Sequence, residues 1–241
     1  MNRGTEMATH FFSETTAMTK IARGVIALMG IAAWFVTQSI LASRGFPEGI
    51  GDGLHIFLSP VTEWLARHDN TANVLLVVTS VVIDLLGCYL LFSGVMGPTV
   101  RPLVGLFLLF ALRQLCQALI ALPPPPNMIW RDPGIPSLLV TYQTANDFFF
   151  SGHTAIVVYG ALELSRYQLR WLKVTAVSIA AIEALTVLVL RAHYSMDVLT
   201  AILAAICASS IAARLADPCD RKLATWSIHS AIVTQWRKHH G

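Results

Sequence analysis

Long apolar stretches, separated by shorter polar segments, follow one another along most of the chain. Each is close to the roughly 20 residues that a helix needs to cross the hydrocarbon core of a bilayer. A segment inside lipid must satisfy its own backbone hydrogen bonds, and a helix does so. The pattern therefore predicts an all-α protein, a polytopic bundle of six transmembrane helices. The six stretches are residues 21–42, 72–96, 102–122, 148–165, 172–190 and 197–215.

The segments around these stretches predict how the chain is organised. Residues 1–20 are polar and rich in threonine, which is typical of a disordered tail. Residues 21–215 form a single six-helix membrane domain without an internal repeat. Within it, residues 43–71 have the apolar spacing of a helix that lies in the membrane interface. Residues 216–241 form a basic tail whose apolar side chains could rest on the membrane surface.

The composition supports a membrane protein and excludes other classes. Hydrophobic residues make up 55% of the chain and charged residues 13%, with a mean hydropathy of +0.60. Soluble domains carry about 25% charged residues. A net charge of +3 is too small to indicate nucleic-acid binding. The four cysteines lack the spacing of a disulfide framework or a zinc site, so we expect no metal and no cofactor.

The distribution of positive charge predicts the orientation in the membrane. Six spans place both termini on one side, and most of the 17 Lys and Arg residues fall on that side. Positively charged loops are retained preferentially in the cytoplasm. Both termini are therefore expected to be cytoplasmic. The long loops 43–71 and 123–147 are expected on the exoplasmic face, in a periplasm or a lumen.

Three polar clusters are expected to meet on that exoplasmic face. Asp147–Thr154 opens the fourth span, Arg191–Val198 opens the sixth, and Arg113–Gln117 lies near the end of the third. Polar and ionisable groups inside a membrane are costly and often mark functional sites. Their convergence from distant parts of the chain makes the membrane domain the expected catalytic domain.

The spacing within the second cluster predicts specific chemistry. His193 and Asp197 are four residues apart, so on a helix they face the same way. A carboxylate in that position can accept a hydrogen bond from Nδ1 of the imidazole, which leaves the lone pair on Nε2. Such a histidine can attack phosphorus and form a covalent intermediate. His153, on a neighbouring helix, could then act as general acid and base.

These residues also have structural interpretations. A single His-x-x-x-Asp match is weak, because a chain with this many histidines and aspartates can contain one by chance. Asp147 could cap the fourth helix, and Gly152 could allow close helix packing. Arg113 could extend its charged head to the interface. Two acids inside the spans remain: we expect Glu183 to be functional, as a partner of a histidine or of Arg113, and Asp84 to be structural.

Together the clusters resemble the paired signatures of the sphingomyelin synthase family, which belongs to the superfamily of type 2 phosphatidic acid phosphatases. The resemblance covers roughly residues 100–200, and the family's six-span architecture agrees with the pattern described above. The matching motifs are Arg113-x-x-x-Gln117-x-x-x-x-Leu122-Pro123, Asp147-x-x-x-Ser151-Gly152-His153-Thr154 and His193-Tyr194-Ser195-x-Asp197-Val198.

The resemblance implies an integral membrane lipid phosphotransferase. Phosphocholine or phosphoethanolamine would pass from a phospholipid donor to a lipid alcohol acceptor through a phosphohistidine. His193 would be the nucleophile, Asp197 its orienting partner and His153 the acid and base. The remaining expected substrate-side residues are Arg113, Gln117, Asp147, Ser151, Gly152, Tyr194 and Glu183. The sequence is compatible with a homo-oligomer.

Departures from the family pattern leave the acceptor open. Residues 145–146 are Ala-Asn in place of Cys-Gly, and the aromatic residues expected after Asp197 are absent, with Ile202 at one of these positions. The phosphatase branch would require a lysine where Gly94 stands and Ser-Arg at positions 186–187. A site with few cations suits a phosphodiester better than a phosphomonoester dianion. The alternatives are a lipid phosphatase or phospholipase C-like hydrolase with water as acceptor, and a non-catalytic lipid-binding protein.

Overall fold

A computed structural model describes residues 50–139 and 149–240, together with parts of 25–40. The burial of side chains is described as far as Leu223 and at Thr225. The predicted tail, residues 1–20, lies outside the described residues, as does much of the first predicted span. Both therefore stay predictions.

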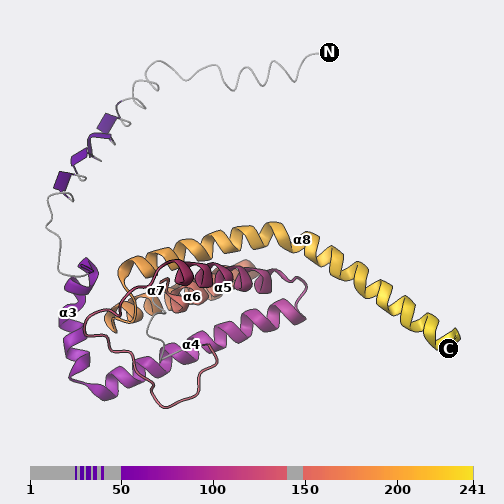
Figure 1. Ribbon diagram of the computed structural model, residues 1–241, viewed down its shortest axis with the longest axis horizontal. Helices are drawn as coiled ribbons and strands as arrows, with labels where there is room; N and C mark the ends of the chain where they lie inside the picture. Colours follow the sequence, from indigo (N-terminus) through magenta and orange to yellow (C-terminus); the bar gives the residue numbers. More distant parts are fainter. Residues whose placement is uncertain are drawn as a thin grey trace. The chain divides into compact units, whose positions relative to one another are not determined.

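The chain separates into two compact units, residues 1–51 and 52–241. In the first unit, the described residues between 25 and 40 are helical. The second unit carries the labelled helices of Figure 1 and has no strand among its described residues, so the all-α prediction is confirmed there. Its elements are α3 (Gly53–Ala66), α4 (Asp69–Met96), α5 (Arg101–Leu119), α6 (Gly152–Leu164), the 3₁₀ turn η1 (Ser165–Tyr167), α7 (Arg170–Val189) and α8 (Ser195–His240).

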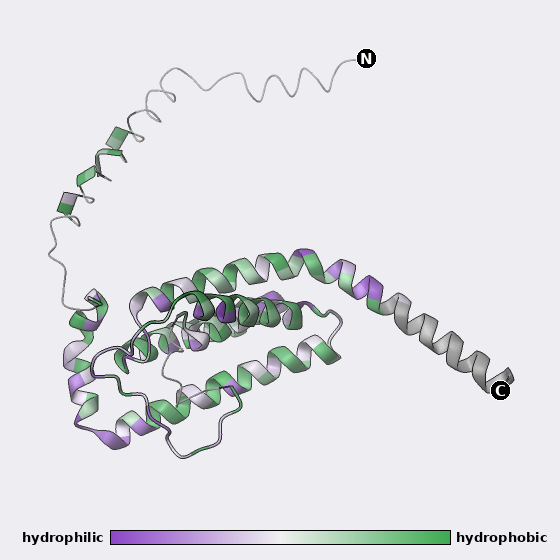
Figure 2. Cartoon of the chain, in the orientation of Figure 1, coloured by the Kyte–Doolittle hydropathy of each residue, from purple (hydrophilic) through white to green (hydrophobic). Residues whose placement is uncertain are grey.

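Four helices in the described part of the chain are long and apolar enough to cross a membrane. They are α4, α5, α7 and the first part of α8, Ser195–Leu223, and apolar residues run along each of them in Figure 2. They coincide with the second, third, fifth and sixth predicted spans, which indicates an integral membrane protein. α8 continues through Pro218 to His240, so the predicted C-terminal tail begins inside this helix.

The fourth predicted span, residues 148–165, is not confirmed as a crossing, and neither is the total of six. α6 has 13 residues and is therefore about 20 Å long, whereas the hydrocarbon core is about 30 Å thick. The helix packs against α4, α5, α7 and α8 and is buried along most of its length. An apolar stretch has the same sequence pattern whether the helix is surrounded by protein or by lipid. Here α6 is surrounded mostly by protein.

The central position of α6 depends on close contact with α5. Tyr159 is fully buried, and its hydroxyl donates a hydrogen bond of 2.9 Å to the carbonyl oxygen of Arg101. Gly105 lies against the Tyr159 ring, where a Cβ atom would collide with it. A glycine at this position therefore lets α5 approach α6 closely.

α5 and α6 run in opposite directions. Arg113, near the end of α5, contacts Phe150 just before α6, while Arg101, at the start of α5, pairs with Glu163 near the end of α6. The start of α8 lies beside the start of α6, because the Ser151 amide donates to a backbone carbonyl in the first turn of α8. We call the end of the bundle that carries His153 the histidine end, and the end that carries Arg101 the arginine end.

The helix expected in the interface within residues 43–71 is α3. Its Ile56 and Phe57 are exposed, whereas Thr62 and Leu65 are buried. The Thr62 hydroxyl donates a hydrogen bond of 2.7 Å to the carbonyl oxygen of Val189, the last residue of α7. α3 is thereby fixed against the end of α7, next to the loop that leads to His193.

Candidate active site

His193 and Asp197 lie where the loop after α7 becomes α8. Nδ1 of His193 is 3.6 Å from Oδ2 of Asp197, and both residues are buried. Oδ2 also accepts a hydrogen bond of 2.9 Å from the amide of Tyr194. Asp197 thus closes the first turn of α8 while its carboxylate faces the imidazole. Its second oxygen, Oδ1, is buried without a hydrogen-bond partner in the described part of the structure.

The loop before His193 is held in an uncommon conformation. Arg191 has a φ of 52°, in the left-handed region that residues other than glycine rarely occupy. Its guanidinium donates to the carbonyl oxygens of Pro126 and His55 and to the Ser59 hydroxyl. Such strain persists where the surrounding contacts fix it, and it often accompanies functional sites.

His153 lies in the first turn of α6, beside the start of α8. Ser151 is the N-cap of α6: its hydroxyl accepts from the Thr154 amide, and its own amide donates to the carbonyl oxygen of Asp197 at 3.3 Å. His153 is only 8% exposed, and its Nε2 has no hydrogen-bond partner in the described part of the structure. Its imidazole interacts electrostatically with the imidazole of His193 and with the guanidinium of Arg113. The first turn of α6 and the loop before α8 therefore bring both histidines to one end of the bundle.

Arg113 binds the backbone at the entrance to α6. Its Nε donates a hydrogen bond of 2.9 Å to the carbonyl oxygen of Phe150. A Cβ atom added to Gly152 would lie 3.2 Å from Nε, so Gly152 leaves room for the guanidinium. The packing role considered for Gly152 therefore applies to the arginine side chain, and Arg113 is directed into the protein.

Three other residues were predicted to belong to the site: Asp147, Gln117 and Tyr194. Asp147 lies outside the described residues. Gln117 lies one helical turn after Arg113 on α5. Tyr194 is buried, and its hydroxyl donates to the carbonyl oxygen of Pro123 at 3.2 Å while its ring stacks on His55. These contacts fix Tyr194 against the loop that carries four consecutive prolines.

The two acids within the helices make structural contacts. Glu183 of α7 accepts a hydrogen bond from the Thr79 hydroxyl of α4, so its described partner is neither a histidine nor Arg113. Asp84 of α4 accepts hydrogen bonds from the Ser137 hydroxyl and from the amides of Leu138 and Leu139. Asp84 therefore anchors the loop 123–147, which was expected on the exoplasmic face, to α4. These backbone amides need hydrogen-bond partners, and the carboxylate supplies them.

Two residues that the sequence did not predict, Asp52 and His55, brace the His193 loop. Asp52 caps α3 by accepting from the amides of Leu54 and His55, and it also accepts from the Ser195 amide at 2.6 Å and from its hydroxyl at 2.9 Å. Nε2 of His55 lies 3.0 Å from the carbonyl oxygen of His193. An aspartate before an apolar helix signals a cap, but nothing in the sequence indicates its second partner.

The charge of Asp52 strengthens this brace. Burial opposes its ionisation, but the hydrogen bonds from Ser195 and His55 and the nearby His55 ring together hold the pKa of the carboxyl below its ordinary value. The ionised carboxylate therefore accepts strong, charge-assisted hydrogen bonds from the start of α8. α3 and α8 are thus joined next to the candidate nucleophile.

The histidine end combines two imidazoles, a carboxylate and a guanidinium. Trp130 covers one side, with its ring edge-on to His153 at a centroid distance of 5.1 Å. In the described residues, no group of three or more His, Cys, Asp or Glu side chains could hold a metal ion. These side chains could supply a histidine nucleophile, an acid–base pair and a cation that binds an anion.

Comparison with known proteins identifies a family. The family model described as AtPDCT1/2 matches residues 53–214, more than half of the chain. The matched region runs from the start of α3 into α8 and contains His153, His193 and Asp197. No curated protein and no solved structure matches the chain.

Proposed function

The chain belongs to the AtPDCT1/2 family, and we propose that it transfers phosphocholine from phosphatidylcholine to diacylglycerol through a phosphohistidine at His193. The family name denotes phosphatidylcholine:diacylglycerol cholinephosphotransferase, a plant lipid phosphotransferase. Membership indicates a membrane lipid headgroup phosphotransferase. The donor, the acceptor and the covalent intermediate are the proposal. The family match does not identify the chain specifically as a sphingomyelin synthase.

The observation that carries the proposal is the junction between α6 and α8. The hydrogen bond from the Ser151 amide to the carbonyl oxygen of Asp197 fixes the first turns of these helices side by side. His153, in the first turn of α6, and His193, just before α8, therefore lie at the same end of the bundle, and they interact electrostatically. A two-step transfer needs this arrangement, because one group must attack phosphorus while another handles the proton of the lipid alcohol.

In the first step, Nε2 of His193 attacks the phosphorus of phosphatidylcholine. The bond from phosphorus to the diacylglycerol oxygen breaks, and that oxygen takes a proton from His153. Asp197 faces Nδ1 of His193 at 3.6 Å, so it stabilises the positive charge that develops on the imidazole. Arg113, beside Gly152, is positioned to offset the charge on the phosphoryl oxygens.

In the second step, His153 takes the proton from the hydroxyl of an incoming diacylglycerol. The freed oxygen attacks phosphorus, and the bond to Nε2 of His193 breaks, which regenerates the enzyme. The buried Nε2 of His153, which lacks a partner in the described part of the chain, would hydrogen-bond the lipid hydroxyl. Exclusion of water from the histidine end would favour the lipid alcohol over water as acceptor.

The position of Arg101 argues against the phosphatase alternative. The first motif of the phosphatase branch has, separated from its lysine by six residues, an Arg-Pro pair that matches Arg101-Pro102 in this chain, and these cations serve a phosphomonoester dianion. Here Arg101 pairs with Glu163 at the arginine end, ten residues along α6 from His153 and thus about 15 Å away along the helix axis. Arg101 therefore cannot bind the phosphate that His193 attacks.

The decisive experiment traps the intermediate. The full-length protein, purified in maltoside micelles, is mixed with phosphatidylcholine carrying radioactive phosphorus and quenched in alkali, in which phosphohistidine survives. We expect labelled protein, and its decay to labelled phosphatidylcholine when diacylglycerol is added. His193→Ala should abolish both labelling and transfer, and full transfer activity in that variant would refute the assignment.

A matched control and an acceptor test complete the design. His68→Ala, which alters an exposed histidine between α3 and α4, should retain labelling and transfer. Release of free phosphocholine at the same rate with and without diacylglycerol would identify a hydrolase instead.

We also propose that the histidine end faces the exoplasmic side, because most of the positive charge lies in the segments of the other side. Arg131 is exposed in the loop before α6. In sealed cells, an Arg131→Cys variant should react with a membrane-impermeant thiol reagent, above the labelling of the unsubstituted chain. Labelling only after permeabilisation would reverse the orientation.

A further inference from the structure

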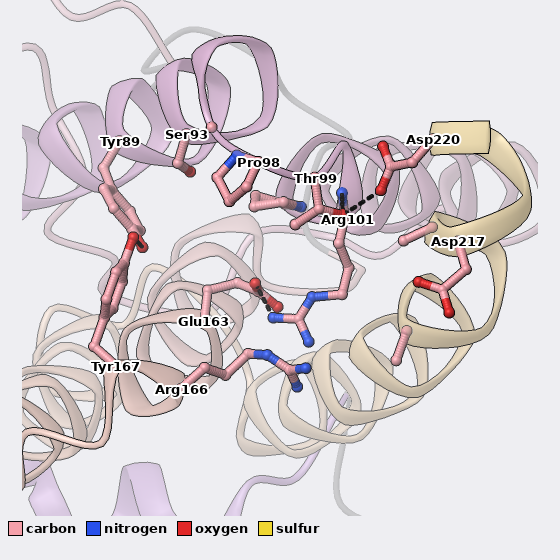
Figure 3. A pocket seen from close by; sticks show the side chains of 14 residues that line it. Tyr89, Ser93, Pro98, Thr99, Arg101, Glu163, Arg166, Tyr167, Asp217 and Asp220 are labelled. Atoms are coloured by element: carbon pink, nitrogen blue, oxygen red, sulfur yellow. Dashed lines mark hydrogen bonds and ion pairs between the residues drawn. The ribbon is translucent and has the colours of Figure 1, made fainter. Parts of the chain in front are cut away.

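A polar cavity of about 460 Å³ lies at the arginine end (Figure 3). Its walls come from the last turns of α4, the segment before α5, the end of α6, η1 and the middle of α8. α4 and α8 are both long enough to cross a membrane, and the cavity lies toward the end of α4. The end of a membrane-crossing helix lies at the depth of the phospholipid headgroups. The volume of the cavity is within the range of pockets that bind small ligands.

A buried ion pair with unused hydrogen-bonding capacity forms the floor of this cavity. Arg101 and Glu163 are 5% and 4% exposed, and Nη2 of Arg101 pairs with Oε2 of Glu163. Nη1 of Arg101 and Oε1 of Glu163 have no hydrogen-bond partner in the described part of the chain. A buried guanidinium N–H without a partner is costly, so Nη1 is a donor available to a ligand.

A second guanidinium lines the same cavity. Arg166, in η1, is exposed, and Figure 3 shows its side chain directed into the cavity beside that of Arg101. Glu163 offsets only one of these two positive charges. Two guanidinium groups that face one space favour a phosphate group between them, because each can donate two parallel hydrogen bonds.

The opposite wall of the cavity is acidic, but only one of its carboxylates is available. Asp220 accepts hydrogen bonds from the Thr99 hydroxyl at 2.7 Å and the Val100 amide at 2.9 Å, so it serves to fix the start of α5. Asp217 is exposed and lies across from the two arginines in Figure 3. A ligand that reaches both walls must therefore carry a negative and a positive charge.

We propose that this cavity binds a zwitterionic phosphocholine or phosphoethanolamine group, with its phosphate at Arg101 and Arg166 and its ammonium at Asp217. Tyr89 and Tyr167, whose hydroxyls lie 3.3 Å apart, line the same cavity on the side of the arginines away from Asp217 (Figure 3). The site is separate from the histidine end and does not depend on the chemistry there. It gives the protein a second place at which to hold a phospholipid headgroup.

The test uses phosphatidylcholine with a photoreactive group in its headgroup, added to the full-length protein in maltoside micelles. After illumination, labelled peptides are identified by mass spectrometry. We expect labels on Tyr89–Arg101 and Glu163–Tyr167, in addition to any label near His153. Phosphocholine should compete with this labelling, and choline chloride should compete at least tenfold less well. Equal competition by choline would show a simple cation site and overturn the proposal.

Substitutions separate the two walls. Arg166→Gln removes an exposed charge and should weaken labelling at the arginine end about tenfold, the loss of one charge-assisted contact. Asp217→Asn should weaken competition by phosphocholine but not by inorganic phosphate. Arg214→Gln, an exposed arginine of α8 outside the cavity lining, is the matched control. Equal losses in Arg166→Gln and Arg214→Gln would refute the site.

The source of the headgroup is decided by a further competitor. A lipid source is indicated if dihexanoylphosphatidylcholine competes at a lower concentration than phosphocholine, since its acyl chains then contribute. Equal competition indicates a soluble zwitterion. Absence of any labelling of Tyr89–Arg101 and Glu163–Tyr167 in the unsubstituted protein would reject both.

Discussion

The two ends of α6 bury polar groups in different ways. At its start, His153 is buried with an unpartnered ring nitrogen in the described structure, and Asp197 of α8 keeps one oxygen free of hydrogen bonds. At its end, Glu163 forms a buried ion pair with Arg101. Groups at the first end can change protonation during a reaction, whereas the charges at the second end hold each other in place. One short helix therefore connects a candidate reactive site to an electrostatically fixed one.

The largest expected effect is at the histidine end. His153→Ala removes the proposed acid and base, and we expect the rate of transfer to fall by roughly 10²–10⁴, with slow formation of the phosphoenzyme still detectable. The measurement is rapid-quench labelling from radioactive phosphatidylcholine. An unchanged transfer rate would show that another group moves the proton, and the contrast between the two ends would lose its basis.

The arginine end should respond mainly through stability. Glu163→Gln leaves the buried Arg101 guanidinium without a counter-charge, which should lower the free energy of unfolding by about 3 kcal/mol. Thermal unfolding in micelles measures this loss. Glu63→Gln, at an exposed position of α3, should change it by less than about 0.5 kcal/mol. Equal effects of the two substitutions would mean that the buried pair contributes nothing particular.

A smaller effect is expected at the brace beside His193. Asp52→Asn weakens the hydrogen bonds to Ser195, so the turnover number should fall about tenfold, the equivalent of one charge-assisted hydrogen bond, while KM changes little. A merely structural role for Asp52 would lower the amount of folded protein but not the turnover number per folded molecule.

The same variant should alter the dependence of stability on pH. The pKa of Asp52 is lowered in the folded protein, so the carboxylate stabilises the fold above the ordinary value of 3.8. This contribution is lost as the pH falls from 3.8 through the lower folded pKa. The stability difference between the unsubstituted protein and Asp52→Asn should therefore shrink in that window, and a constant difference would contradict the assignment.

The smallest effect is expected from crowding Arg113. In Gly152→Ala, the new methyl group would lie 3.2 Å from Nε of Arg113. The guanidinium is the far end of a flexible side chain and can move by a few tenths of an ångström, so transfer should slow only about threefold, equivalent to less than 1 kcal/mol. Steady-state transfer at saturating phosphatidylcholine measures it. A loss as large as that of His153→Ala would make Gly152 part of the catalytic geometry.

Local sequence rules predicted much of the helical architecture and part of the site. The proximity of His193 and Asp197 was predicted, and their nitrogen–oxygen distance is 3.6 Å. The expected reason was wrong, because α8 begins at Ser195 and His193 lies in the preceding loop, outside the helical face of Asp197. The cap of α6 was not predicted: Asp147 was considered for that role, whereas the structure has Ser151 as the N-cap. The partner of Glu183 could not be predicted from local sequence rules. Packing between distant segments decides which helix lies beside α7, and the described partner of Glu183 is Thr79 of α4.

The sequence by itself determined properties that depend on near neighbours: which segments are helical, and which of them are apolar enough for a membrane. The tertiary structure alone decided that α6 is a buried centre too short to be counted as a crossing. It also decided that Asp52 braces α8 and that Asp84 holds a loop. The physical reason is that an apolar or acidic side chain has the same local signature whatever surrounds it, and only packing supplies the partner.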